Sequence, residues 1–274
     1  MACSFVPPWL KTAFGVVILC IILFPLYWMA NASLQPHEAL LAPSPSWFPN
    51  PLVLENYLAV LDTQGHNIFV SCVVAGGAAL LSLIIAAPCA YGLVVFRMRW
   101  TTLFVLLLLL AQMLPHVVMA NALYAIYARI GLLNSYTGLI LADSTMGVPF
   151  AILILRAFMA SLPRTLIEAA LCDGAGHWGV FFRIVLPLSR NGLITSGLFC
   201  FLFAWSDFVF ALTMETRQKI VPITLGIYQY IGTHQTDWNA IMATAVLASI
   251  PPIVLLLLGQ RRIAAGLTGG AVKE

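Results

Sequence analysis

Six long apolar stretches constrain the fold of this chain more than any other feature of its sequence. They lie near residues 12–32, 68–95, 102–125, 138–159, 193–214 and 241–259. A helix of about 20 residues crosses a hydrocarbon core of roughly 30 Å, so each stretch is long enough to span a membrane. Charged residues make up 8% of the chain, against about 25% in soluble domains. The sequence therefore predicts an all-α integral membrane protein with six transmembrane helices.

Basic residues are unevenly distributed between the segments that join these stretches. With both termini placed inside, the inner segments carry Lys11, Arg97, Arg99, Arg156, Arg164, Arg183, Arg190, Arg261, Arg262 and Lys273. The outer segments carry Arg129, Arg217 and Lys219. Because cytoplasmic segments are enriched in lysine and arginine, this bias predicts a multi-pass protein with both termini in the cytoplasm.

Several classes of site find no support in the sequence. The net charge is +3 without a basic run, so a nucleic-acid partner is not expected. The six cysteines form no C-x-x-C pair, which argues against a metal site or a disulfide framework. No nucleophile–base pair and no phosphate-binding glycine loop is present. We therefore expect a protein that is not an enzyme and that binds no cofactor.

A few polar residues fall inside the predicted spans, where polar side chains usually face a cavity or a neighbouring helix. The candidates for a substrate pathway are Gln112, His116 and Asn121 on the third span and Trp205, Ser206 and Asp207 on the fifth. Such a set suits a polyhydroxylated solute. The same residue types also join helices to one another, and Asp207 is alternatively a partner for a basic group of another subunit.

The predicted cytoplasmic loop 157–193 contains signals for two short helices. Ser161 and Pro163 favour a helix start, and we expect a helix over residues 163–173. Gly174 suits the left-handed conformation that ends a helix. A second helix is expected over residues 177–185, stopping before Pro187. Together they predict a rigid elbow that leads into the fifth span.

This elbow is more apolar than a loop that faces only water. Its apolar residues are Leu166, Ile167, Leu171, Trp178, Val180, Phe181, Phe182 and Ile184. Two interpretations follow: the loop presents a face that a partner buries, or it packs beneath its own helix bundle.

The elbow also carries the pattern E-A-A-x3-G-x9-I-x-L-P, which resembles the signature of permease subunits of bacterial ABC importers. The resemblance implies that the loop docks on a separate ATPase. The residues that carry this implied coupling role are Glu168, Ala169, Ala170, Asp173, Gly174, Ile184, Leu186 and Pro187.

The end of the chain resembles the tail of the carbohydrate-uptake permeases of the maltose-importer type. The matching residues include Gly266, Leu267, Thr268, Gly270 and Lys273. The resemblance implies that this tail reaches an interface between ATPase subunits; a flexible glycine-rich end with a basic membrane anchor is the alternative. We expect one permease domain over 1–274, with a coupling loop at 157–193 and a tail at 260–274.

The resemblance implies a complete assembly in a prokaryotic plasma or inner membrane. Its other parts are a second homologous permease, two ABC ATPase subunits that use ATP and Mg, membrane lipid, and an extracytoplasmic solute-binding protein. The implied cargo is an oligosaccharide, an amino sugar, a glycerol phosphate compound or another sugar-like solute. The alternative is an ion-coupled secondary transporter or channel subunit, but only Asp207 and Asp143 among the acidic residues approach membrane depth.

Overall fold

The computed structural model describes residues 7–40, 42–44, 46–96, 99–231 and 236–269, and these residues are almost entirely helical. Four helices are long and apolar enough to cross a membrane: α1 (Pro8–Ser33), α3 (Glu55–Val95), α6 (Tyr136–Ala160) and α13 (Trp238–Gly269). The number rises to six if each of two bent helix pairs counts as one span. These helices meet the requirement by length and composition. The structure confirms the helical class and the four predicted stretches that these helices cover.

The chain divides into two compact units, and α3 and α13 contribute to both. The first unit contains residues 1–65 and 227–250. In this unit the amides of Asn56 and Asn239 tie the chain after α1 to the starts of α3 and α13. Asn56 donates to the carbonyl of Ser33 at 2.9 Å, and Asn239 donates to the carbonyl of Gln35 at 2.6 Å. A short helix, α2 (His37–Leu40), lies between α1 and α3.

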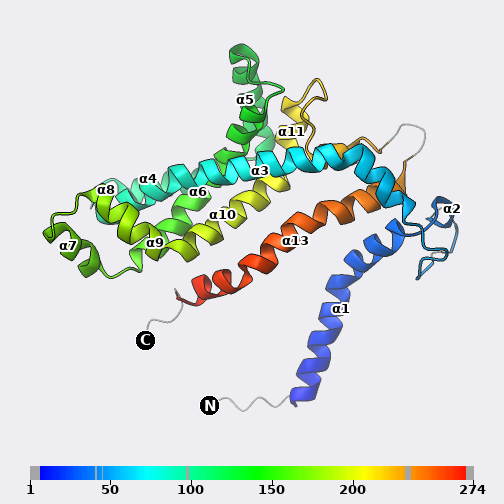
Figure 1. Ribbon diagram of the computed structural model, residues 1–274, viewed down its shortest axis with the longest axis horizontal. Coiled ribbons are helices and arrows are strands. Elements are labelled where there is room, and N and C mark those ends of the chain that lie inside the picture. The colour runs from blue at the N-terminus through cyan, green and yellow to red at the C-terminus, as the bar shows by residue number, and fades with distance from the viewer. Residues whose placement is uncertain (1–6, 41, 45, 97–98, 232–235, 270–274) are drawn as a thin grey trace. The chain divides into compact units, whose positions relative to one another are not determined.

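The second unit contains residues 66–226 and 251–274. Besides parts of α3 and α13 it holds α4 (Thr101–Ala111), α5 (His116–Ile130), α6, α7 (Arg164–Cys172), α8 (His177–Val180), the π-helix η1 (Phe181–Val185), α9 (Leu186–Leu188), α10 (Arg190–Trp205), α11 (Val209–Met214) and most of α12 (Ile223–Tyr228). In Figure 1, α6 and α10 run alongside each other, and α7 and α8 lie at the end of this unit away from α5 and α11.

Small residues allow the helices of the second unit to approach closely. A Cβ atom at Gly147 on α6 would lie 2.4 Å from the Ser82 hydroxyl on α3 and 3.3 Å from the Cys200 sulfur on α10. A Cβ atom at Gly192 would lie 2.7 Å from the ring of Phe158. In a membrane the hydrophobic effect does not drive helices together, because lipid tails are as apolar as the helices. Small residues instead allow the close packing that holds membrane helices together.

The third predicted span, residues 102–125, is not one straight helix. The segment forms α4 and α5, which meet at an angle of 94°. Pro115 stands just before α5 with an extended backbone (φ −61°, ψ 133°). Proline disfavours the helical conformation in the residue before it and lacks the N–H that a continuing helix would use. The break therefore lies where the proline predicts a bend.

The fifth predicted stretch, 193–214, is also interrupted. Helix α10 ends at Trp205 and α11 begins at Val209. The Asp207 carboxylate lies in the gap and accepts hydrogen bonds from the backbone N–H groups of Phe210 and Ala211, at 3.3 and 3.1 Å. A carboxylate that accepts hydrogen bonds from the unpaired N–H groups of the first turn stabilises the start of a helix. The predicted fifth span is therefore interrupted at Asp207, and the Asp207 side chain stabilises the break.

Candidate functional site

The first helix of the elbow, α7, begins after Pro163 and ends in a Schellman motif. The N–H of Ala175 donates to the carbonyl of Ala170 at 3.0 Å, and the N–H of Gly174 donates to that of Leu171 at 3.1 Å. Gly174 has φ +85°, in the left-handed region that favours glycine. The predicted helix and its glycine terminator are therefore confirmed.

The second part of the elbow differs from the prediction. Helix α8, η1 and α9 follow one another without a break from His177 to Leu188, so the helix does not stop before Pro187. The five-residue π-helix precedes the proline and shifts the hydrogen-bond register. Pro187 then follows the π-helix as the second residue of α9. The bend of 76° falls after Leu188 instead.

The apolar residues of the elbow separate into an inner and an outer group. Ile167, Val180 and Phe181 are 8%, 0% and 3% exposed, and they belong to a core cluster that includes residues of α3 and α6. The outer group stays exposed and forms what we call the elbow patch: Leu166, Trp178 and Phe182, at 44%, 67% and 57% exposure. The elbow therefore packs on its own bundle and still presents an apolar face.

The residues of the E-A-A signature do not share one environment. Ala170 is buried on the inner side of α7, and Ile184 and Leu186 are half-buried. The exposed members are Glu168, Ala169, Asp173, Gly174 and Pro187. The signature thus combines positions that hold the elbow on the bundle with positions that are open to a partner.

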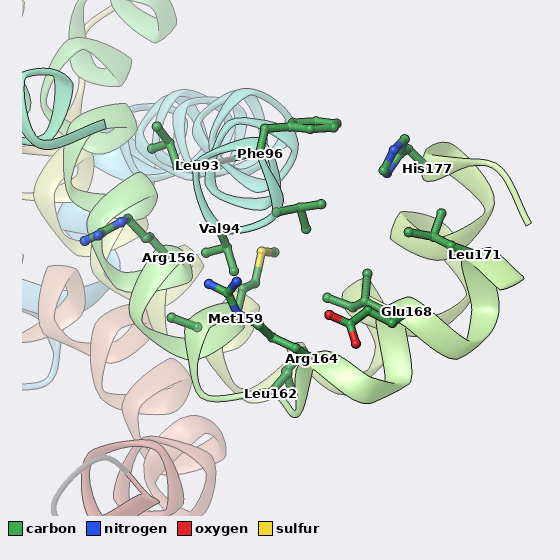
Figure 2. Close-up of a pocket in the computed structure, with 13 residues that line it drawn as sticks. Leu93, Val94, Phe96, Arg156, Met159, Leu162, Arg164, Glu168, Leu171 and His177 are labelled. Carbon is green, nitrogen blue, oxygen red and sulfur yellow. The ribbon is translucent and has the colours of Figure 1, made fainter. Parts of the chain in front are cut away.

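A pocket of about 380 Å³ lies between the elbow and the ends of α3 and α6; we call it the elbow pocket. Its charged and polar side chains are Arg156, Arg164, Glu168 and His177. Figure 2 shows the Arg164 guanidinium and the Glu168 carboxylate extending into the same space. Among the described residues neither group has a salt-bridge partner. The remaining walls are apolar, including Leu93, Val94 and Phe96.

His177 connects the elbow to α3 at this pocket. Its Nδ1 atom lies 3.4 Å from the Tyr91 hydroxyl, and its ring centroid lies 4.9 Å from that of Phe96. The sequence reasoning missed Arg156, Arg164 and His177 as pocket residues. Arg164 stands one helical turn before Glu168, which was readable, but the approach of α3 and α6 depends on the tertiary fold.

A second pocket, also of about 380 Å³, opens at the two helix breaks; we call it the break pocket. It brings together four of the six predicted pathway residues: Gln112, His116, Ser206 and Asp207. Asn121 is exposed and does not line it. Trp205 is buried and stacks on Phe201, with ring centroids 5.5 Å apart.

The polar groups of the break pocket differ in availability. Asp207 caps α11, and the Ser206 hydroxyl donates to the Leu202 carbonyl. The His116 ring stacks on Phe210 at 5.9 Å. Within the described part of the chain, the side chains of Gln112 and His116 have no hydrogen-bond partner. These two side chains are therefore the ones available to a polar solute.

The tail residues are only partly described. Helix α13 continues to Gly269, so Gly266, Leu267 and Thr268 are helical. Gly270 and Lys273 lie outside the described residues. In the described ranges no group of three or more His, Cys, Asp or Glu residues is placed to hold a metal ion.

Comparisons with known proteins agree with this arrangement. Residues 78–269 match the family described as binding-protein-dependent transport system inner membrane component. The diacetylchitobiose uptake system permease protein DasC of Streptomyces coelicolor is 33% identical over 263 residues, covering 94% of this chain and 95% of the relative. The sulfoquinovosyl glycerol transport system permease protein SmoH of Agrobacterium fabrum is 32% identical over 253 residues, covering 92% and 89%.

The fold also resembles a solved membrane transporter. A chain of a bacterial ABC transporter that imports the acidic polysaccharide alginate superposes with a TM-score of 0.80 at 18% identity, covering 93% of this chain and 95% of that one. Permease subunits of such systems are not themselves enzymes, and ATP hydrolysis belongs to a separate subunit. The family match covers most of the chain, and the chain therefore belongs to the inner membrane components of binding-protein-dependent transport systems.

Proposed function

We propose that this chain is the permease subunit of an ATP-driven importer for a sugar or sugar-like solute, and that it forms half of the translocation pathway. The relatives include permease proteins for diacetylchitobiose, sulfoquinovosyl glycerol and trehalose. The other half is a second, homologous permease. A solute-binding protein delivers the cargo from outside, and two ATPase subunits act from the cytoplasm with ATP and Mg. Membership in a binding-protein-dependent family weighs against an ion-coupled carrier or a channel.

In this proposal the chain crosses the membrane six times, with both termini in the cytoplasm. The spans are α1, α3, the bent pair α4–α5, α6, α10 continued by α11, and α13. The distribution of basic residues supports this orientation, because the inner segments carry ten and the outer ones three. The elbow then lies in the cytoplasm, where an ATPase can reach it.

The observation that carries the proposal is the elbow patch on a rigid support. Trp178 and Phe182 stack with ring centroids 5.9 Å apart, while the buried Ile167 and Val180 hold the same segment on the bundle. An exposed apolar face of this kind is typical of a partner interface. We infer that the patch docks on an ATPase, and that the exposed Glu168 and Ala169 contribute to the contact.

The tail supports the same arrangement, since α13 carries Gly266, Leu267 and Thr268 beyond the apolar part of the span. We propose that these residues and the following Gly270 and Lys273 reach the ATPase interface. The break pocket is the proposed contribution of this subunit to the solute pathway.

The docking role is tested with Trp178→Gln, and Trp100→Gln is the matched control. Both tryptophans are exposed, at 67% and 73%, but Trp100 lies outside the elbow. Buried tryptophans at interfaces contribute about 2 kcal/mol or more, so Trp178→Gln should weaken ATPase binding at least about 30-fold. We expect it to lose both ATPase co-purification and ATP-dependent uptake, while Trp100→Gln keeps the ATPase.

A second variant tests the elbow without removing a contact. Gly174→Lys places a bulky charged residue at the left-handed terminator. It should uncouple ATP hydrolysis from uptake while the protein stays in the membrane. Full ATP-dependent uptake by both Trp178→Gln and Gly174→Lys would refute the docking role.

A further inference from the structure

The elbow pocket lies at the level where two proposed spans end. Helix α3 ends at Val95 and α6 ends at Ala160, and residues at both ends line the pocket. Arg99 and Trp100 lie in the short segment between α3 and α4, and Trp100 is 73% exposed. Tryptophan and arginine are enriched where a helix leaves the hydrocarbon core. Given the spans proposed above, the pocket stands at the height of the lipid headgroups.

The charges in the pocket favour an anion. The pocket lining includes two arginines, Arg156 and Arg164, and one carboxylate, Glu168. These three groups together carry one net positive charge. Figure 2 shows the Arg164 side chain reaching past Met159 into the space between α6 and α7. Among the described residues, neither arginine forms a salt bridge. One phosphodiester, with one negative charge, would neutralise this set.

An apolar groove adjoins the pocket on α3. It has a volume of about 400 Å³ and is lined by Pro88, Cys89, Gly92, Leu93, Trp100 and Phe104, among others. Leu93 lines both the groove and the elbow pocket. The groove residues of α3 extend over about 8 Å of the helix before its end, at 1.5 Å per residue. A charged pocket thus meets an apolar groove that leads into the hydrocarbon region.

We propose that the elbow pocket and this groove together bind one anionic glycerophospholipid. The phosphodiester accepts hydrogen bonds from Arg164, Arg156 contributes a second positive charge to the pocket lining, and one acyl chain lies along the groove. Basic pockets between membrane helices on the cytoplasmic side recognise lipid headgroups, and arginine forms strong charge-assisted hydrogen bonds with phosphate oxygens. A free phosphate would leave the groove uncovered. A zwitterionic aminophospholipid would leave the net positive charge of the site uncompensated.

The site also connects the lipid to the elbow. Arg164 lies on α7 and Arg156 lies on α6, so a lipid that contacts both joins the elbow to a span. The elbow patch does not line this pocket: Leu166, Trp178 and Phe182 are absent from its walls. The lipid and the elbow patch, on which the proposed ATPase docks, therefore lie on different surfaces of one segment, and Glu168 lies at the boundary between them.

The experiment uses the intact complex, purified by a tag on this chain from nanodiscs of phosphatidylglycerol and phosphatidylethanolamine in equal amounts. Native mass spectrometry counts the lipids retained on the chain. The variants are Arg164→Gln and Arg156→Gln, on different helices, so that a folding defect of one leaves the other informative. Arg183→Gln is the control, because Arg183 is exposed on the elbow and does not line the pocket.

We expect one phosphatidylglycerol retained by the native chain and by Arg183→Gln. Arg164→Gln should retain about tenfold less, because it removes a charge-assisted hydrogen bond, and Arg156→Gln about fivefold less, because it removes a positive charge near the headgroup. Glu168→Gln should retain at least as much as the native chain, since it removes a negative charge. Equal retention by the pocket variants, equal retention of phosphatidylethanolamine, or displacement of the lipid by millimolar inorganic phosphate would overturn the proposal.

This inference rests on the proposed membrane arrangement, and its failure is distinguishable from failure of the importer function. The same preparations are assayed for bound ATPase. Trp178→Gln should lose the ATPase and keep phosphatidylglycerol, whereas Arg164→Gln should lose phosphatidylglycerol and keep the ATPase. Loss of both partners together in both variants would contradict the use of separate surfaces.

Discussion

The left-handed glycine at the end of α7 gives a prediction whose magnitude follows from the structure. Gly174 has φ +85°, and an added Cβ atom would meet no atom within 4 Å. Gly174→Ser therefore introduces backbone strain and no steric clash. A residue with a Cβ atom in the left-handed region costs about 1–2 kcal/mol. This cost should open the Schellman motif about 5- to 30-fold more often.

Gly176→Ser is the matched control for this change. Gly176 also has no atom within 4 Å of an added Cβ, but its φ is −68° and it precedes α8 as the N-cap residue. Serine is favoured at that position. Both substitutions reduce the flexibility of the unfolded chain alike, so this contribution cancels in the comparison.

Hydrogen exchange of the elbow, measured on the complex in nanodiscs, reads out the effect. The amide of Ala175, which donates to the Ala170 carbonyl at 3.0 Å, should exchange about 5- to 30-fold faster in Gly174→Ser and no faster in Gly176→Ser. If both variants accelerated exchange equally, or neither did, the conformational role of Gly174 would be refuted.

Three further predictions concern the bundle and the break pocket. Gly147→Ala should destabilise the protein by about 1–3 kcal/mol, because the new methyl group would lie 2.4 Å from the Ser82 hydroxyl on α3. Gly76→Ala is the control: an added Cβ atom at Gly76 meets no atom within 4 Å, so this change should not lower thermal stability. Asp207→Ala should lower the free energy of unfolding by about 1 kcal/mol, because it removes the cap of α11. Asp207→Asn should retain most of this stability, because an amide oxygen also accepts hydrogen bonds from backbone N–H groups. Thermal unfolding in detergent measures both changes. Gln112→Ala should raise the KM of uptake, whereas Asn121→Ala, which lies outside the pocket, should leave it unchanged; equal effects would argue against the pocket as the pathway.

The sequence located the long helices because lipid imposes a strong compositional signal. Helices α1, α3, α6 and α13 each cover a predicted stretch. The break between α10 and α11 was not predicted, because the apolar stretch 193–214 continues on both sides of it. Pro115 did signal a bend, but its angle of 94° depends on packing. Asp207 was read as a pathway residue, while it also serves as a helix cap.

The elbow was predictable where local chemistry determines it. Pro163 and Gly174 mark the ends of α7 because their backbone preferences suit those positions. The π-helix before Pro187 was not predictable, since no residue preference distinguishes it from an α-helix. The elbow pocket could not be predicted from the sequence, because Arg156 and His177 line one pocket only when the elbow folds back on α3 and α6. The single domain over 1–274 stays a prediction.

The most direct test of the importer function is to purify this chain from its native membrane in mild detergent and to identify by mass spectrometry the proteins that accompany it. The account predicts an ABC ATPase and a second, homologous permease in the complex, with a solute-binding protein captured when its sugar is present. Recovery of a stable, transport-competent complex that contains no ATPase would contradict it.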